Sequence, residues 1–567
     1  MYIFRKLGFL IALIALLFLI GCATYTVNKK VIVKAPAHGC EIYENNVISA
    51  NERGGYFDTK IKKLPNDKCE LEFKTITNNS ETEGGITRIL DRIKMQGKKP
   101  LIFIHGGLND FNEGLERVTT TVDSILEESD YYPLFLIWPS GIDTYFDSLN
   151  NYLQGEWDRP VDRIAVPFKF ATDLLLIPAR LPINYASNYK LASNSSFYLE
   201  KNSPPFNNFL RSFHSLFLFA EEEEKKDVPY ITNDPCFSKR YFKEGFYCLD
   251  INKEDVDSFY YKQLWSRILF TPVKFITIPI ADPLSRRAWD SMYARIRFTF
   301  RTPCSADKSG IGNCKPGIFK QFFYKLRDYT MDQSIDNVTL IGHSMGTIVA
   351  GEIIREFPEI PYENVVFSGA AISIREFKNT VESTLLRKLK EMQNYTHFLN
   401  EREAFGEELS LQTKNKKIES IIKDNDAAII KLKLLIEQTR PFRFFNLSLH
   451  PFAEAREENG WGTVPSGSLL EWIDNMIENP LDGLDRTMGK WTNIVPLLPS
   501  EGSKDNYFNN DLLNNCYMHF SRFGLNSIQP TMHAHLGNKD DKFKFWIPEN
   551  WRLNNHQFQK AECNSQG

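Results

Sequence analysis

Some segments of this chain place apolar residues at every second position, as strands do, and others place them at the longer spacing of helices. Short apolar runs rich in β-branched and aromatic residues predict strands at residues 98–104, 337–341, 365–371, 443–449 and 516–523. The second of these runs leads into a glycine-flanked turn, and the residues after the turn have helical composition. This order predicts a strand, a sharp turn and a helix.

The turn has the sequence Gly342-His343-Ser344-Met345-Gly346, a Gly-x-Ser-x-Gly pattern. A serine on such a strand-to-helix turn is expected to project its hydroxyl from the top of a sheet, on a bend so tight that glycines must flank it. The Met345 N–H and the start of the helix then face the oxygen of a bound carbonyl, where negative charge develops. We therefore predict Ser344 as a nucleophile and Met345 as an oxyanion-hole donor.

A second glycine-rich turn follows the first predicted strand, where residues 98–104 end in His105-Gly106-Gly107. Glycine lets the backbone approach a substrate oxygen closely, and loops of this type supply the other oxyanion-hole N–H. We assign that donor to Gly107. We expect His105 to brace the loop rather than to take part in the chemistry.

These features resemble the α/β-hydrolase superfamily of serine esterases and lipases, and more closely a group of large bacterial and fungal lipase-like hydrolases. The resemblance extends in order from residue 98 to residue 551 and includes five further runs, at residues 136–141, 288–292, 365–375, 446–457 and 467–474. It implies an α/β-hydrolase fold, with a mostly parallel central sheet flanked by helices. It implies no cofactor.

The other members of a catalytic triad are placed by their order along the chain. In this fold the acid follows the second strand after the nucleophile, and the histidine follows the last strand. Glu454 follows the second strand and is our predicted acid, with Glu457 and Glu501 as alternatives. Two histidines, His533 and His535, lie in the loop that directly follows the last predicted strand. We predict His533 as the base because a small residue follows it, as in the relatives, and His535 stays an alternative.

The start of the chain has the pattern of a bacterial lipoprotein signal peptide. Basic residues precede residues 7–20, an apolar stretch that is short for a transmembrane helix and long enough for a signal sequence. Residues 19–22, Leu-Ile-Gly-Cys, match the lipobox, whose cysteine is diacylated and becomes the new N-terminus. We expect residues 1–21 to be removed and Cys22 to anchor the protein at the cell envelope. An ordinary cleaved signal or a plain anchor is the alternative.

The residue after the lipobox cysteine bears on the location. It is alanine rather than aspartate, which by resemblance to lipoproteins in general favours the outer membrane in a Gram-negative source. The other eight cysteines are an even number, which indicates disulfides in an exported chain. Proximity along the sequence predicts Cys40–Cys69, Cys236–Cys248, Cys304–Cys314 and Cys516–Cys563. No Cys-x-x-Cys spacing supports a zinc site, and we expect no metal.

The 567 residues carry a formal net charge of −3, which argues against a nucleic-acid partner. An N-terminal region with strands (residues 22–85) precedes a hydrolase core in three pieces (86–140, 337–375 and 441–567). The first insertion, 141–336, is a predicted cap with aromatic and apolar runs, either packed on the sheet or acting as a lid that docks on lipid. The second, 376–440, is charged and has apolar residues at helical spacing, which predicts an extended helical hairpin.

Together these patterns predict a membrane-anchored serine hydrolase that cleaves carboxylic esters, with a lipid or another hydrophobic ester as substrate. Ser344 would attack the ester carbonyl, His533 would accept its proton, and Glu454 would orient the imidazole. Thioester and amide substrates would use the same groups. The alternative is a catalytically inactive envelope lipoprotein that uses the hydrolase scaffold for binding.

Overall fold

The structure is a computed structural model that describes most of the chain between residues 28 and 558. The described residues are 28–51, 54–76, 79–107, 111–138, 140, 289, 292–301, 305–306, 312–313, 315–332, 334–410, 416–449, 453–454, 457, 468–474, 478, 483–494, 497, 507–523, 530–537, 543–551 and 557–558. Several predictions fall outside this set: the signal peptide with Cys22, most of the cap, Glu501, and the pairs Cys236–Cys248 and Cys304–Cys314.

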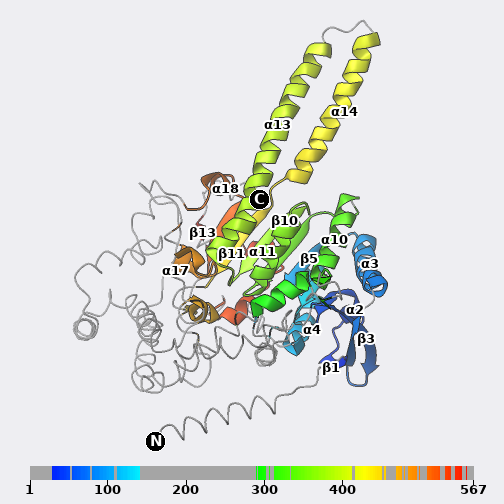
Figure 1. The fold of residues 1–567 in the computed structure, drawn as a ribbon, viewed down its shortest axis with the longest axis vertical. Helices are drawn as coiled ribbons and strands as arrows, with labels where there is room; N and C mark the ends of the chain where they lie inside the picture. The colour runs from blue at the N-terminus through cyan, green and yellow to red at the C-terminus, as the bar shows by residue number, and fades with distance from the viewer. Residues whose placement is uncertain are drawn as a thin grey trace, which may run out of the picture.

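A large twisted sheet runs through the molecule (Figure 1). In the described part of the chain it has eleven strands in the order β1-β4-β3-β2-β6-β5-β9-β10-β11-β12-β13. From β2 to β12 in this order every neighbouring pair is parallel, while β1, β4, β3 and β13 pair antiparallel. The prediction of an α/β fold with a mostly parallel sheet is confirmed. The bounds are β1 (Asn28–Lys34), β2 (Val47–Ala50), β3 (Tyr56–Leu64), β4 (Lys68–Ile76), β5 (Lys99–Ile104), β6 (Tyr131–Ile137), β9 (Val338–His343), β10 (Tyr362–Ser368), β11 (Arg443–Ser448), β12 (Met518–Arg522) and β13 (Gln557–Phe558), with β7 (Ser305–Ala306) and β8 (Gly312–Asn313) in a separate pair.

The central strands are apolar on both faces because helices cover both faces. In β5, Ile102 and Ile104 belong to one hydrophobic cluster, and Leu101 and Phe103 belong to a second. This alternation follows from the two-residue period of a strand, which sends successive side chains to opposite faces. Each face therefore has its own apolar core.

Helices α3, α10 and α11 contribute to the first cluster, and α4 with the segment around Trp546 contributes to the second. α10 lies within the range assigned to the cap, yet it contacts α3 and β2, so this helix belongs with the sheet. The bounds are α2 (Ile42–Asn45), α3 (Asn79–Gln96), α4 (Phe111–Glu128), α10 (Ile318–Met331), α11 (Gly346–Glu356), α12 (Ile374–Phe377), α16 (Leu469–Trp472), α17 (Trp491–Ile494) and α18 (Asn510–Asn514), with 3-10 turns η5 (Gly483–Asp485), η7 (His533–Gly537) and η9 (Pro548–Asn550).

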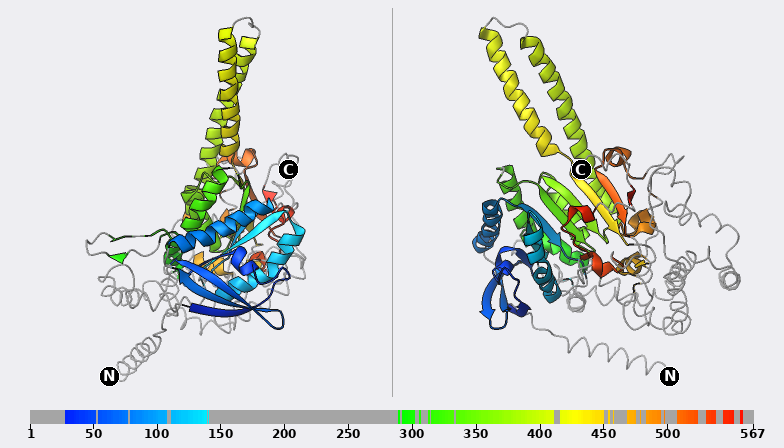
Figure 2. Two further views of the ribbon diagram at one scale, coloured as in Figure 1. Left: turned by 90° about the vertical axis from the view of Figure 1, so that its right-hand side faces the viewer. Right: turned by 180° about the vertical axis from the view of Figure 1, so that it is seen from behind.

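The connection between the neighbouring strands β10 and β11 contains two long helices. They are α13 (Ser383–Ser410), which continues from α12 through the π-helical turn η3 (Lys378–Glu382), and α14 (Lys416–Thr439). The pair projects from the body of the molecule (Figures 1 and 2). An ion pair between Lys433 and Glu403 at 3.0 Å joins the two helices. The predicted helical hairpin is present.

One predicted disulfide is present, between Cys40 and Cys69, and it ties the chain before α2 to β4. Cys516 is also disulfide-bonded, and Cys563, its predicted partner, lies outside the described residues. None of the helices in the described ranges is both long and apolar enough to cross a membrane.

Candidate active site

Ser344 lies where β9 ends and α11 begins. Its φ angle is 52°, in the left-handed region that residues other than glycine rarely adopt. Its N–H donates to the Ser368 carbonyl oxygen at 2.9 Å, and its own carbonyl oxygen accepts from the N–H groups of Thr347 at 3.0 Å and Ala371 at 3.2 Å. These bonds hold a backbone conformation that is otherwise costly, as is common at functional sites. The predicted strand, sharp turn and helix are confirmed.

The two glycines of the turn are required by close contacts. A Cβ at Gly342 would lie 2.9 Å from Thr347 Cα, and a Cβ at Gly346 would lie 2.3 Å from the Ile104 carbonyl oxygen. Both distances are shorter than real Cβ contacts. A larger residue would therefore push the start of α11 away from the end of β5, which leads into the loop with Gly107.

The two predicted oxyanion-hole residues lie against each other. A Cβ at Gly107 would be 2.2 Å from Met345 Sδ. In the part of the chain that the structure describes, neither residue donates its N–H to another backbone group. His105 fixes this loop, because its Nδ1–H donates to the Gly106 carbonyl at 2.8 Å and its Nε2 accepts from the Trp138 N–H at 3.2 Å. The bracing role predicted for His105 agrees with these contacts.

The hydroxyl of Ser344 is buried, which corrects the expectation that it projects freely from the top of the sheet. The residue is 1% exposed, and its Oγ has no hydrogen-bond partner among the described residues. The loop with Gly106 contributes to this burial, since a Cβ there would lie 2.7 Å from Ser344 Cβ. The sequence pattern predicts the turn but carries no information on which distant residues cover it.

His533 begins η7, after β12, and lies beside the turn that carries Ser344. Its carbonyl oxygen accepts from His343 Nε2 at 3.1 Å, and the two imidazole centroids are 5.2 Å apart. On the other side, a Cβ at Gly369 would be 2.8 Å from His533 Cε1. His533 thus contacts His343, the residue before Ser344, and Gly369, the residue that directly follows β10. Neither nitrogen of its ring has a partner among the described residues, so the hydrogen bond to Ser344 is not formed.

The protonation state of His533 suits a general base. Burial, and after it the positive charge of Arg117, lowers the pKa of His533 to about 4. The ring is therefore neutral at neutral pH and able to accept a proton. The alternative base, His535, lies in the same turn, where its Nδ1 accepts from the Thr531 N–H at 3.3 Å.

The two described carboxylates have different contacts. Glu454 is buried, and one of its oxygens accepts a hydrogen bond from the Ser468 hydroxyl while Oε1 has no partner among the described residues. Burial raises the pKa of Glu454 to about 8. Glu457 instead accepts from the His533 backbone N–H at 2.8 Å. No hydrogen bond joins either carboxylate to the His533 ring.

A buried charged network beside Glu454 was missed by the sequence analysis. Lys490 pairs with Glu471 at 2.7 Å and with Asp474 at 3.4 Å, and Asp474 also accepts from the Asn493 amide at 2.7 Å. Charged residues in loops are usually solvated, so no sequence pattern predicted the burial of Lys490, Glu471 and Asp474. The only sequence feature that pointed to this network was the run at residues 467–474, to which no role had been assigned.

The network supports the turn that carries Ser344. A Cβ at Gly489 would lie 2.1 Å from the Ala370 backbone nitrogen. The loop that carries Lys490 therefore packs directly on the chain after β10, next to Ala371, whose N–H binds the Ser344 carbonyl oxygen. The buried ion pairs of Lys490 with Glu471 and Asp474 hold this loop in place.

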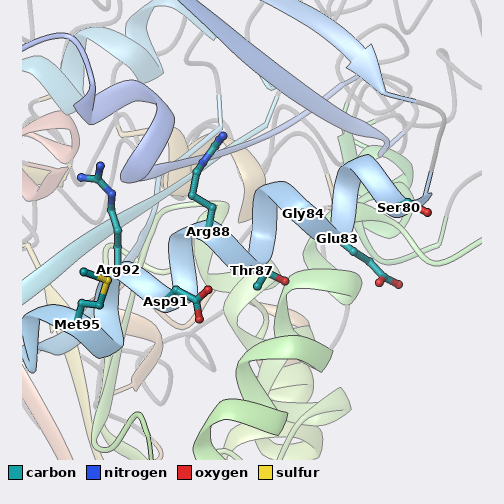
Figure 3. A pocket seen from close by; sticks show the side chains of 8 residues that line it. All are labelled: Ser80, Glu83, Gly84, Thr87, Arg88, Asp91, Arg92 and Met95. Carbon is teal, nitrogen blue, oxygen red and sulfur yellow. The ribbon is translucent and has the colours of Figure 1, made fainter.

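A hollow lies at the surface of α3 (Figure 3). It is lined by Ser80, Glu83, Gly84, Thr87, Arg88, Asp91, Arg92 and Met95, and includes none of the candidate catalytic residues. Within the described ranges, no cluster of three or more His, Cys, Asp and Glu side chains is arranged to hold a metal ion. No protein family, curated protein or solved structure gave a significant match to this chain.

Proposed function

We propose that this protein is a serine hydrolase of the α/β-hydrolase fold that cleaves carboxylic esters and is anchored to the cell envelope through a lipid on Cys22. The observation that carries this proposal is the strained turn of Ser344, with a φ of 52°, packed beside the η7 turn that begins at His533. The strand order β6-β5-β9-β10-β11-β12 supports it, because it brings the loops after β5, β9, β11 and β12 to one edge of the sheet.

The residues have distinct roles in this proposal. Ser344 Oγ attacks the ester carbonyl, its proton passes to His533, and the N–H groups of Met345 and Gly107 bind the oxyanion. His533 then protonates the leaving alcohol, and water releases the acid from the acyl-enzyme. One preorganised oxyanion donor contributes about 3–4 kcal/mol to the lowering of such a barrier.

We assign the triad acid to Glu454 and a supporting role to Glu457. The Ser468 hydroxyl donates to one oxygen of Glu454, and the other oxygen has no partner in the described structure. That second oxygen is therefore available to accept a hydrogen bond from the His533 ring N–H. Ser344, His533 and Glu454 each carry a buried polar atom without a partner among the described residues. A site that completes its hydrogen bonds only when substrate is bound would leave these three residues with such atoms. Glu457 fixes the His533 backbone.

A hydrophobic ester or lipid is the proposed substrate class. Trp289 and Met292 are buried in the same apolar cluster as Met345, and Met292 lies against Gly107, so apolar side chains line one side of the oxyanion loop. An acyl chain gains about 0.8 kcal/mol for each methylene that it buries in such a site. Because Ser344 is covered, substrate must displace the covering residues before attack.

The test is covalent labelling with a fluorophosphonate. The wild-type protein should be labelled, and Ser344→Ala should not be. Ser383→Ala, on α13, is the matched control and should be labelled like the wild type. Esters of graded acyl length should then be hydrolysed by the wild type, with a loss on the order of a million-fold in Ser344→Ala. Labelling that survives in Ser344→Ala would remove Ser344 as the nucleophile.

The burial of the Ser344 hydroxyl favours a second candidate, an envelope lipoprotein that retains the scaffold for binding only. This candidate predicts no labelling and no ester hydrolysis by a wild-type protein that unfolds cooperatively. The two candidates therefore separate in the same experiment.

A further inference from the structure

Arg117, on α4, has a buried polar atom that the proposed chemistry does not use. Its Nη1 has no hydrogen-bond partner among the described residues. A buried guanidinium nitrogen without a partner is costly, because a charged donor has lost its water. The same holds for His343 Nδ1, which is also buried and without a partner in the described part of the chain.

These two atoms face the same point of the η7 turn. A Cβ at Gly537 would lie 2.0 Å from Arg117 Nη1 and 3.0 Å from His343 Nδ1. Since both distances start from one point, the two nitrogens are no more than about 5 Å apart. At that separation the two nitrogens can form a direct hydrogen bond after a small side-chain shift, or one water molecule can bridge them.

Their chemistry is complementary. The His533 carbonyl oxygen can only accept, so His343 Nε2, 3.1 Å away, carries the proton of the imidazole. Neutral His343 then has a lone pair on Nδ1, which is an acceptor. Arg117 can only donate and stays charged. A donor nitrogen and an acceptor nitrogen, neither of which has a partner in the described structure, therefore lie close to the same point beside Gly537.

We propose that Arg117 and His343 form a positioning relay, in which Arg117 donates to His343 Nδ1, His343 donates to the His533 carbonyl, and a permanent positive charge is held behind the His533 imidazole. The relay fixes the backbone of η7 against the turn of Ser344. Its catalytic consequence depends on the proposed function, whereas its electrostatic and structural consequences do not.

The positive charge of Arg117 affects the pKa values of several histidines, including His533. It lowers the pKa of His533, after burial, and contributes to lowering the pKa of both His343 and His105. The other titratable groups that the structure places near His533 or Arg117 are Glu113 on α4, Glu457 after β11, and His535 in η7. Removing Arg117 should therefore raise the pKa of His533, although burial keeps it below the ordinary value.

The first experiment measures the titration of each histidine by C2 hydrogen–deuterium exchange and mass spectrometry in the full chain. In Arg117→Met the His533 midpoint should move to higher pH, and it should stay in place in Arg355→Met, which replaces an exposed arginine on α11 and is the matched control. An unchanged His533 midpoint in Arg117→Met would overturn the electrostatic part of the relay. This readout does not require enzymatic activity.

The second experiment tests the hydrogen-bonded part. Glutamine offers one donor and one acceptor, so His343→Gln should keep the relay and His343→Leu should break it. Amide exchange in residues 530–537 should accelerate about tenfold in His343→Leu and stay close to wild type in His343→Gln. Equal exchange in the two variants would overturn the relay. With an ester as substrate, kcat should fall about 100-fold in His343→Leu with KM little changed. Failure of wild-type hydrolysis would count against the proposed function alone.

Discussion

Adding one methyl group at Gly369 should displace the His533 ring and reduce turnover with little additional loss of stability. Gly369 has a φ of 54°, and a Cβ there would lie 2.8 Å from both His533 Cε1 and Leu536 Cδ1. Ordinary contact begins at 3.4 Å, so the ring must shift by about 0.6 Å. An alanine in the left-handed region also costs about 1–2 kcal/mol of stability.

The chain offers a matched control for the backbone cost. Gly97, after α3, has a φ of 61°, and a Cβ there would meet nothing within 4 Å. Gly97→Ala should therefore lose the same 1–2 kcal/mol and no activity. Misplacement of a catalytic group by about 1 Å can cost 100-fold in rate, so a 10- to 100-fold fall in kcat is expected for Gly369→Ala.

The assay pairs urea unfolding with ester hydrolysis at substrate saturation for both variants. Similar stability losses and a fall in kcat confined to Gly369→Ala would support the placement of His533. A Gly369→Ala protein that keeps kcat within about twofold of wild type would refute the reasoning, because the ring would then be either elsewhere or unimportant.

Three further predictions concern stability. Burial raises the pKa of Glu454 to about 8, so wild-type stability should decrease as pH rises from about 4.5 to 8, and Glu454→Gln should unfold at higher urea than wild type at pH 9, by a free-energy difference on the order of 1–4 kcal/mol; an identical midpoint would contradict this. The pKa values of His105 and His533 are lowered to about 4, mainly by burial. The stability that their neutral rings contribute is therefore complete above pH 6.5 and is lost as the pH falls toward 4. Urea titrations in the Glu454→Gln background should show this as a loss of about 3 kcal/mol per histidine at most, and equal stability at pH 7 and pH 4.5 would count against it. Replacing Cys40 and Cys69 by alanine opens a crosslink with a sequence separation of 29 and should cost about 3–4 kcal/mol of unfolding free energy without changing kcat, and a loss of kcat in the folded variant would contradict the separation of this edge from the active site.

Local patterns predicted the parts of the fold that local physics controls. The Gly-x-Ser-x-Gly run formed the predicted tight turn, in which Gly342 leaves room for the backbone of Thr347 five residues later. The charged segment with apolar residues at helical spacing formed α13 and α14. β11 was also predictable, because Phe445, Leu447 and Leu449 alternate with polar residues in an aromatic-rich run.

Other features depend on residues far apart in the sequence. The burial of Ser344 could not be predicted, because the chain around Gly106 that covers it lies more than 200 positions away. The choice between Glu454 and Glu457 required their partners, Ser468 and His533. The burial of Lys490 required its two acidic partners, which no single window of sequence brings together.

The position of β1 has a consequence for where such an enzyme could work. β1 is an edge strand that begins at Asn28, only six residues after Cys22. A fully extended chain advances about 3.5 Å per residue, so a lipid on that cysteine would keep the first strand within about 20 Å of the bilayer surface. Tethered this closely, the protein would meet esters that reside in the same membrane at far higher local concentration than esters dissolved in the surrounding fluid.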